Sequence, residues 1–349
     1  MAHDPDQLIG TTLGDRYRIL RDLGEESLGH VFVAQDLGEG DRLVQIKVIS
    51  PSIGADEETF ARFGREISAS FMVSHPNTVE VFDYGQQGEL RYLVSEFLAA
   101  RPLAEVLQGG VLSVERAALI GAQVAAAVAA AHQEGIVHRA LSPETVLLLE
   151  NSRDGDYIKV RDFGLSKLSD EDDGDVTRAD VRVGSPAYMA PEYIDEGIFD
   201  PKGDLYALGC LLFELVSGQP PYVGDPSTIL RLQVEGDPPR LSAKVPGVPG
   251  WFDELVADLL SKEPGARPGS HQVAQRVAGG LGRVLHPPQL WPLDAEGRVI
   301  RPEEAREPGL PVGRVVGIVA VALLGVVTLV LILIASVATI VLLLTNLPS

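Results

Sequence analysis

The sequence predicts an α+β protein, in which a small strand-rich part precedes a larger helical part and one C-terminal transmembrane helix. Strand-like runs are concentrated before residue 100, and helical patterns dominate from about residue 113 to residue 281. Beyond them, an uncharged run rich in Val, Leu, Ile and Ala extends from Val315 to Leu344. Strands and helices that are segregated along a chain favour an α+β fold over alternating βα units.

The first part is predicted to be a small antiparallel sheet with one helix. Glycine-rich turns separate three runs of strand-forming residues, at 17–20, 31–34 and 43–49. A helix follows, because four apolar residues recur at helical spacing: Phe60, Phe63, Ile67 and Phe71. Two more strands are predicted near residues 78–84 and 91–97.

The second part is predicted to be helical. Ser113 is a good N-cap for a long Ala-rich helix over 114–134, which Gly135 ends. Three further helices are predicted at 204–217, 251–261 and 270–281. Residues 285–311 contain many prolines and charges and little periodicity, so they are predicted to be a linker.

Composition excludes some classes of partner and indicates a compartment. The formal net charge of −20 argues against nucleic acid, because neutralising phosphates requires Lys and Arg. The single Cys210 lies in an apolar run and has no partner for an internal disulfide, so we expect a buried thiol in a reducing cytosolic compartment.

The C-terminal apolar run is long enough to cross a bilayer, and we expect a single-pass helix at 312–345. Arg301, Arg306 and Arg314 precede it and no basic residue follows it, so the positive-inside rule keeps the preceding domain cytoplasmic, at the inner membrane. The polar N-terminus predicts no signal peptide. The predicted parts are a tail at 1–15, a domain at 16–284, the linker at 285–311, the anchor, and a short extracytoplasmic tail at 346–349.

A series of motifs at 16–284 resembles the bacterial serine/threonine protein kinases of the eukaryotic-like type, which implies a two-lobed kinase fold. The motifs include a glycine-rich loop at 23–31, a Val-Gln-Ile-Lys strand at 44–47, and a loop at 136–145 that begins Ile-Val-His-Arg. Asp162-Phe163-Gly164 and an Ala-Pro-Glu sequence at 190–192 follow in the expected order.

The resemblance implies an ATP and magnesium site. The residues that match nucleotide-binding positions are Gly24, Gly29, Val31, Lys47, Glu66, Glu96, Leu98, Leu147 and Asp162, and Asp162 also matches a Mg²⁺ ligand. Two departures oppose binding. Glu26 replaces a glycine beside the phosphates, and Gln45 replaces an alanine above the adenine ring. We therefore expect ATP and Mg²⁺ binding to be weak or absent.

The loop at 136–145 departs from the family at each of its three chemical positions. Ala140 replaces the aspartate that accepts the substrate proton, Ser142 a lysine that steadies the transferring phosphate, and Thr145 a Mg²⁺-binding asparagine. No catalytic residue is therefore intact. Residues whose family role is structural are retained: His138, Phe163, Glu192, Asp204 and Arg267. The resemblance implies a buried ion pair between Glu192 and Arg267, and an Asp204 side chain that anchors the backbone of this loop.

Two residues match regulatory positions. In the family, Arg139 docks a phosphorylated activation segment, and we expect an active partner kinase to phosphorylate Thr177. Alternatively, Thr177 is an ordinary loop residue, and the acidic run at 170–175 occupies Arg139 without any modification.

Loss of chemistry with retention of scaffold predicts a membrane-anchored pseudokinase that signals by binding other proteins, such as an active kinase or a signalling complex. A weakly active serine/threonine kinase that still uses Lys47 and Asp162 is the alternative. A nucleotide-sensing switch without phosphoryl transfer is a third hypothesis. Because few residues follow the anchor, we expect no extracytoplasmic sensor domain.

Overall fold

The computed structural model describes residues 7–26, 29–40, 42–49, 71–153, 155–163, 185–294 and 296–301. The chain divides into two units, Met1–Val299 and Ile300–Ser349, and all described strands and helices belong to the first. The predicted helix around Phe60, the membrane helix at 312–345 and the tail at 346–349 lie outside the described residues.

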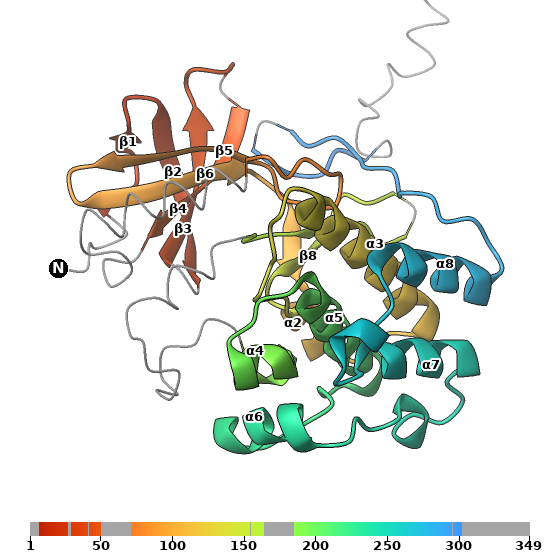
Figure 1. Cartoon of the computed structure of the whole chain (residues 1–349). Helices are drawn as coiled ribbons and strands as arrows, with labels where there is room; N and C mark the ends of the chain where they lie inside the picture. The colour runs from red at the N-terminus through yellow and green to blue at the C-terminus, as the bar shows by residue number, and fades with distance from the viewer. Residues whose placement is uncertain are drawn as a thin grey trace, which may run out of the picture. The chain divides into compact units, whose positions relative to one another are not determined.

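The predicted antiparallel sheet is present, with six strands in the order β1-β2-β3-β4-β6-β5 (Figure 1). The strands are β1 (Thr12–Leu13), β2 (Tyr17–Glu26), β3 (Gly29–Asp36), β4 (Arg42–Ile49), β5 (Val81–Gln87) and β6 (Leu90–Glu96). One face of the sheet buries Ile19, Phe32, Ile46 and Val94 completely. The central strand β3 is buried on both of its faces, because Val31 and Val33 on the opposite face are as inaccessible as Phe32 and Ala34.

A second, three-stranded sheet follows, with the order β7-β8-β9. Its strands are β7 (Ala100–Pro102), β8 (Val146–Leu149) and β9 (Ile158–Val160). A bridge between Thr78 and Val160 joins β9 to the segment before β5. This sheet therefore places the loop that precedes β8 and the Asp-Phe pair that follows β9 next to the first sheet.

Helices form the rest of the first unit (Figure 1). They are α2 (Leu103–Gln108), α3 (Val114–Gln133), α4 (Pro191–Glu196), α5 (Pro201–Ser217), α6 (Pro226–Glu235), α7 (Gly250–Leu259) and α8 (Ser270–Leu281). The Ser113 side chain caps α3 by accepting the Arg116 N–H, as predicted. Helix α5 begins earlier than the prediction of residue 204, because Asp200 caps it and Pro201 has a φ suited to a first turn.

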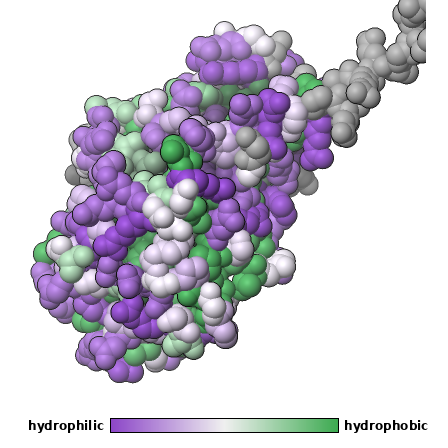
Figure 2. Space-filling model, turned by 90° about the vertical axis from the view of Figure 1, so that its right-hand side faces the viewer, coloured by the Kyte–Doolittle hydropathy of each residue, from purple (hydrophilic) through white to green (hydrophobic). Residues whose placement is uncertain are grey.

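The core of this unit centres on α3 and α5. Among the described residues, α3 is the one helix whose length and mean hydropathy of 1.4 would suit a membrane span, and ten of its residues are buried in the core. Cys210 of α5 is also fully buried, and burial raises the pKa of its thiol to about 12. The face drawn in Figure 2 is mostly hydrophilic, with hydrophobic residues interspersed.

The described part of the predicted linker at 285–311 is packed against the domain. The Trp291 N–H donates to the Asn151 carbonyl at 2.7 Å, and the Arg153 N–H donates to the Gln289 carbonyl at 2.8 Å. The Arg153 guanidinium also lies 4.1 Å from the centroid of the Trp291 ring. The first unit therefore extends to Val299, beyond the predicted boundary at residue 284. An extended segment that pairs with a loop has no periodicity to detect.

Candidate functional site

A pocket lies between the first sheet and the residues around β8 and β9. It is lined by Gln45, Lys47, Val73, Val79, Val81, Leu93, Ser95, Leu98, Leu147, Arg161, Asp162 and Phe163. Apolar side chains line one region of it, and charged side chains line another. This combination suits a ligand with a flat apolar part and a polar part.

Lys47 and Asp162 meet at the charged end of this pocket. Lys47 is paired with Val31 of β3 and Leu93 of β6, so β4 is held between two strands at that point. Its side chain is 5% exposed, and its Nζ lies 2.9 Å from Asp162 Oδ1. The structure thus brings together two residues predicted to bind nucleotide and metal, whereas Glu66 lies outside the described residues.

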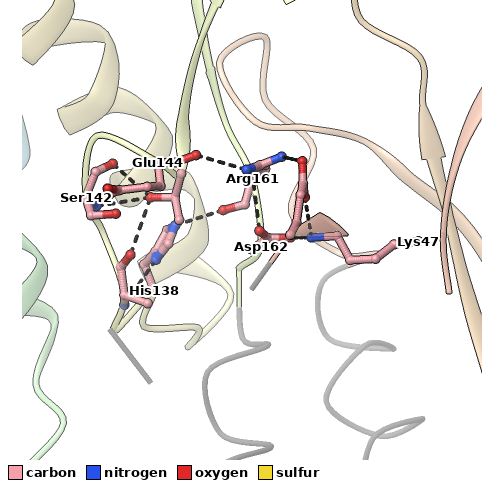
Figure 3. Close-up of polar contacts among 9 residues, drawn as sticks. Lys47, His138, Ser142, Glu144, Arg161 and Asp162 are labelled. Carbon is pink, nitrogen blue, oxygen red and sulfur yellow. Dashed lines mark hydrogen bonds and ion pairs between the residues drawn. The ribbon is translucent and has the colours of Figure 1, made fainter. Parts of the chain in front are cut away.

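Two further charged groups join this pair, and together the four form the cleft charge cluster: Glu26, Lys47, Arg161 and Asp162. The Glu26 carboxylate lies 3.1 Å from Lys47 Nζ and accepts a hydrogen bond from Arg161 Nη1. Arg161 Nε lies 3.5 Å from Asp162 Oδ2, and its Nη2 donates to the Glu144 carbonyl. Figure 3 shows Arg161 above Asp162 and Lys47 to its right, both joined to it by dashed lines.

The electrostatics of the cluster keep its buried groups ionised. Burial by itself would raise the pKa of Asp162, but attraction to Lys47 and then Arg161 outweighs it, and the pKa lies below its usual value. Burial would lower the pKa of Arg161, but Asp162 and Glu26 together raise it. Two carboxylates therefore face two cations, and the formal charges of the cluster cancel.

The residues at the three substituted positions of the predicted catalytic loop either contact the backbone of that loop or have no polar side-chain group. Thr145 Oγ1 accepts the Ser142 N–H at 3.1 Å and lies 3.1 Å from the Ser142 carbonyl oxygen. The threonine hydroxyl is thus engaged by the backbone of its own loop. The Ser142 residue is buried, and Ala140 presents only a methyl group.

The scaffold of this loop makes the contact that the sequence predicted for Asp204. Its carboxylate accepts the backbone N–H groups of His138 and Arg139, both at 2.9 Å, and it also contacts His132 Nε2 at 2.7 Å. Arg139 has a φ of 67°, a left-handed conformation that these bonds stabilise. Helix α5 therefore fixes the backbone of the loop.

His138 connects this loop to the segment that follows β9. Its Nε2 lies 2.9 Å from the Arg161 carbonyl oxygen, and its ring packs edge-on against the Phe163 ring with centroids 4.7 Å apart. Burial lowers the pKa of His138 despite the nearby Asp204 and Asp162. The imidazole is therefore neutral at pH 7.

Glu192 and Arg267 form the predicted ion pair, with two parallel hydrogen bonds of 2.6 and 2.8 Å. The Arg267 side chain has no exposed surface and also donates to the Ser261 and Lys202 carbonyls. This bidentate pair ties α4 to the segment before α8.

The remaining predicted residues lie around the pocket. Leu98 and Leu147 line it, whereas Gly24, Gly29, Val31 and Glu96 are not among its lining residues in the described part of the chain. At Gly29 a Cβ atom would come within 2.0 Å of the Val48 carbonyl oxygen, so a side chain is excluded there. Glu96 pairs with Lys159 at 2.5 Å.

Of the two predicted regulatory residues, only Arg139 lies in the described part of the chain. Its guanidinium lies 3.9 Å from the centroid of the Phe199 ring, an arrangement typical of a cation–π contact. Thr177 and the acidic run at 170–175 lie outside the described residues.

Sequence reasoning did not single out Arg161, the second cation of the cleft charge cluster. Its position directly before Asp162 was visible, but the residue types alone did not show that its side chain would turn into the cleft. Its partner Glu26 stands where the family has a glycine, and the two side chains are in contact.

A strand-rich lobe and a helical lobe, with Lys47 and Asp162 meeting in the cleft between them, define a protein of the kinase fold. The model of the protein kinase domain family matches residues 17–277, and the chain belongs to this family. The predictions of a two-lobed kinase fold and of membership in the kinase family are therefore confirmed.

Relatives of this chain include bacterial serine/threonine-protein kinases. Serine/threonine-protein kinase pkn3 of Myxococcus xanthus is 35% identical over 275 residues, covering 76% of this chain and 50% of the relative. PrkC of Bacillus subtilis is 32% identical over 259 residues, covering 74% and 39%. The chain thus spans half or less of the length of these relatives.

Among solved structures, the kinase domain of PknI from Mycobacterium tuberculosis is similar, with a TM-score of 0.62 and 27% sequence identity. The match covers 77% of this chain and 98% of that domain.

Proposed function

We propose that this chain is a pseudokinase, a protein kinase domain that signals by binding other proteins and has lost useful phosphoryl transfer. The observation that carries the proposal is Ala140. A methyl group there can neither accept the proton of a substrate hydroxyl nor orient that hydroxyl. Losing one acid–base group typically lowers the rate by about 10²–10⁴, or roughly 3–5 kcal/mol of barrier.

The neighbouring substitutions support the same proposal. Ser142 leaves no cation at the position where a lysine would steady the transferring phosphate. The Thr145 hydroxyl bonds to the backbone of its own loop, and a neutral hydroxyl is a poor substitute for an amide oxygen on Mg²⁺. These three effects act on one chemical step and are not additive.

ATP and Mg²⁺ are the ligands that membership of the kinase family implies. When bound in a protein kinase, they supply the transferable phosphoryl group and the positive charge that stabilises it. Lys47 would hold phosphates and Asp162 would hold the metal. In the arrangement described, however, both side chains are engaged within the cleft charge cluster. With both side chains engaged in these contacts, the present arrangement fits Mg-ATP poorly.

A weakly active serine/threonine kinase is the second candidate. At the level of the family, the comparisons favour this candidate over loss of activity, because the named relatives are serine/threonine kinases. The retained contact between Lys47 and Asp162 also favours it. This candidate requires that Mg-ATP binds and that Lys47→Ala abolishes transfer.

The proposal also covers the location of the protein in the cell and the class of its binding partners. The predicted helix at 312–345 would anchor the chain in the inner membrane, with the kinase domain in the cytoplasm. The partners would be other proteins, including an active kinase that phosphorylates Thr177, and not nucleic acid. Affinity capture from native membranes tests the partner class, with a chain lacking 312–349 as the matched control.

A radiolabel assay of the purified full chain tests the loss of transfer. The protein is incubated with Mg-ATP and a degenerate serine/threonine peptide mixture, alongside Lys47→Ala and Asp162→Asn. We expect the wild-type chain to show no more turnover than these two variants. Turnover of about one per second is within the usual range for enzymes. Such turnover, if both variants abolished it, would contradict the proposal that the chain is a pseudokinase.

A further inference from the structure

Glu26 brings a carboxylate into the cleft from the end of β2. It is the last residue of β2, where the strand pairs with Gly29 of β3, and its side chain is 25% exposed. Its carboxylate nevertheless contacts two cations from different parts of the chain. Lys47 belongs to β4, and Arg161 follows β9.

Arg161 is the counterpart of Glu26. Its side chain is 13% exposed and is held by a hydrogen bond to the Glu144 carbonyl. A guanidinium that is mostly removed from water requires an anion nearby. Asp162 supplies one partial contact at 3.5 Å, and Glu26 supplies the direct hydrogen bond.

The cluster therefore already holds an anion between its two cations. Any phosphate that reached Lys47 would have to displace the Glu26 carboxylate or lie against it, and both outcomes are unfavourable. The rest of the pocket does not oppose a neutral ligand in this way. Val79, Leu98 and Leu147 provide apolar surface, and Ser95 provides a hydrogen-bonding group for the edge of a flat ring.

We infer that Glu26 is a specificity-determining residue, an internal anion that makes the cleft select neutral purine nucleosides over nucleoside polyphosphates. Arg161 holds this carboxylate in place and becomes a phosphate-binding cation when the carboxylate is neutralised. The inference concerns binding alone, so it does not depend on whether phosphoryl transfer is lost.

Calorimetric binding of adenosine and ATP to the full chain in detergent tests the inference, with Mg²⁺ and with a chelator. We expect the wild-type chain to bind adenosine more tightly than ATP. Glu26→Gln keeps the size of the side chain and removes its charge. It should raise ATP affinity by about tenfold or more and change adenosine affinity by less than about twofold.

Glu25→Gln is the matched control, because Glu25 is exposed on the same strand and carries the same charge. It should leave the ratio of the two affinities unchanged. Arg161→Met, added to Glu26→Gln, should reverse the gain in ATP affinity, and thermal unfolding verifies that each variant is folded. The inference is overturned if wild type prefers ATP, if it does not bind adenosine, or if Glu26→Gln and Glu25→Gln act alike.

Discussion

The Lys47 ammonium lies 2.9 Å from the Asp162 carboxylate, so a residue of β4 is tied directly to the segment that follows β9. In an active kinase these two groups divide their work between phosphates and metal. Here each is the other's counter-charge, and the pair contributes to the connection between the lobes. The same two residues therefore carry a structural role that does not require nucleotide.

Lys47→Met tests this structural role. The change leaves the buried Asp162 with Arg161 as its remaining cation, and removing one partner of a buried ion pair costs about 3–5 kcal/mol when nothing compensates. Because Arg161 compensates in part, we expect a loss of about 1–3 kcal/mol in the free energy of unfolding. Chemical denaturation of the full chain in detergent measures it. Lys244→Met, at an exposed position, is the control and should change stability by less than about 0.5 kcal/mol.

His138 should make stability depend on pH. As a neutral ring it donates from Nε2 to the Arg161 carbonyl and accepts the Ala140 N–H at Nδ1, and protonation would place a second donor against that N–H. Because burial lowers its pKa in the folded state, the unfolded chain takes up the proton first. The stabilisation is complete above the ordinary value of 6.5 and is lost as pH falls below it toward the folded pKa.

Thermal unfolding between pH 5 and pH 8 measures this dependence. His138→Gln should flatten the fall below about pH 6.5, whereas substitution of the exposed His271 by glutamine should leave it unchanged. An equally steep fall in the His138 variant would assign the dependence to other groups.

The sequence predicts contacts that depend on the order and spacing of family motifs, but it does not predict contacts that depend on tertiary packing. The resemblance to the kinase family implies the contacts of Asp204, Glu192 and Arg267, because a shared fold fixes the distances between such landmarks. The side-chain direction of Arg161 and the docking of Trp291 against Asn151 depend on tertiary packing. Neither produces a periodic pattern, so no window of sequence could reveal them.

The pair Glu192–Arg267 should be the most sensitive ion pair described here. Both side chains are buried, and Arg267→Met would leave the Glu192 carboxylate without its two hydrogen bonds. We expect a loss of about 3–5 kcal/mol in the free energy of unfolding. Arg276→Met breaks an exposed pair with Asp258 and should cost less than about 1 kcal/mol. Similar losses in both variants would show that burial does not set the difference.

Restoring the catalytic groups separates lost chemistry from a blocked cleft. The triple variant Ala140→Asp, Ser142→Lys, Thr145→Asn returns a proton acceptor, a cation and a metal ligand, but leaves Glu26 paired with Lys47 and Arg161. We expect transfer by the triple variant to exceed wild type by about 10² or more at saturating ATP, since one acid–base group alone supplies that much. Adding Glu26→Gly should then lower the KM for ATP by about tenfold with a smaller effect on kcat, because the carboxylate acts on binding. Adding Glu25→Gly instead should do neither. If Glu26→Gly raised kcat and left KM unchanged, the carboxylate would oppose the transition state and not the bound nucleotide.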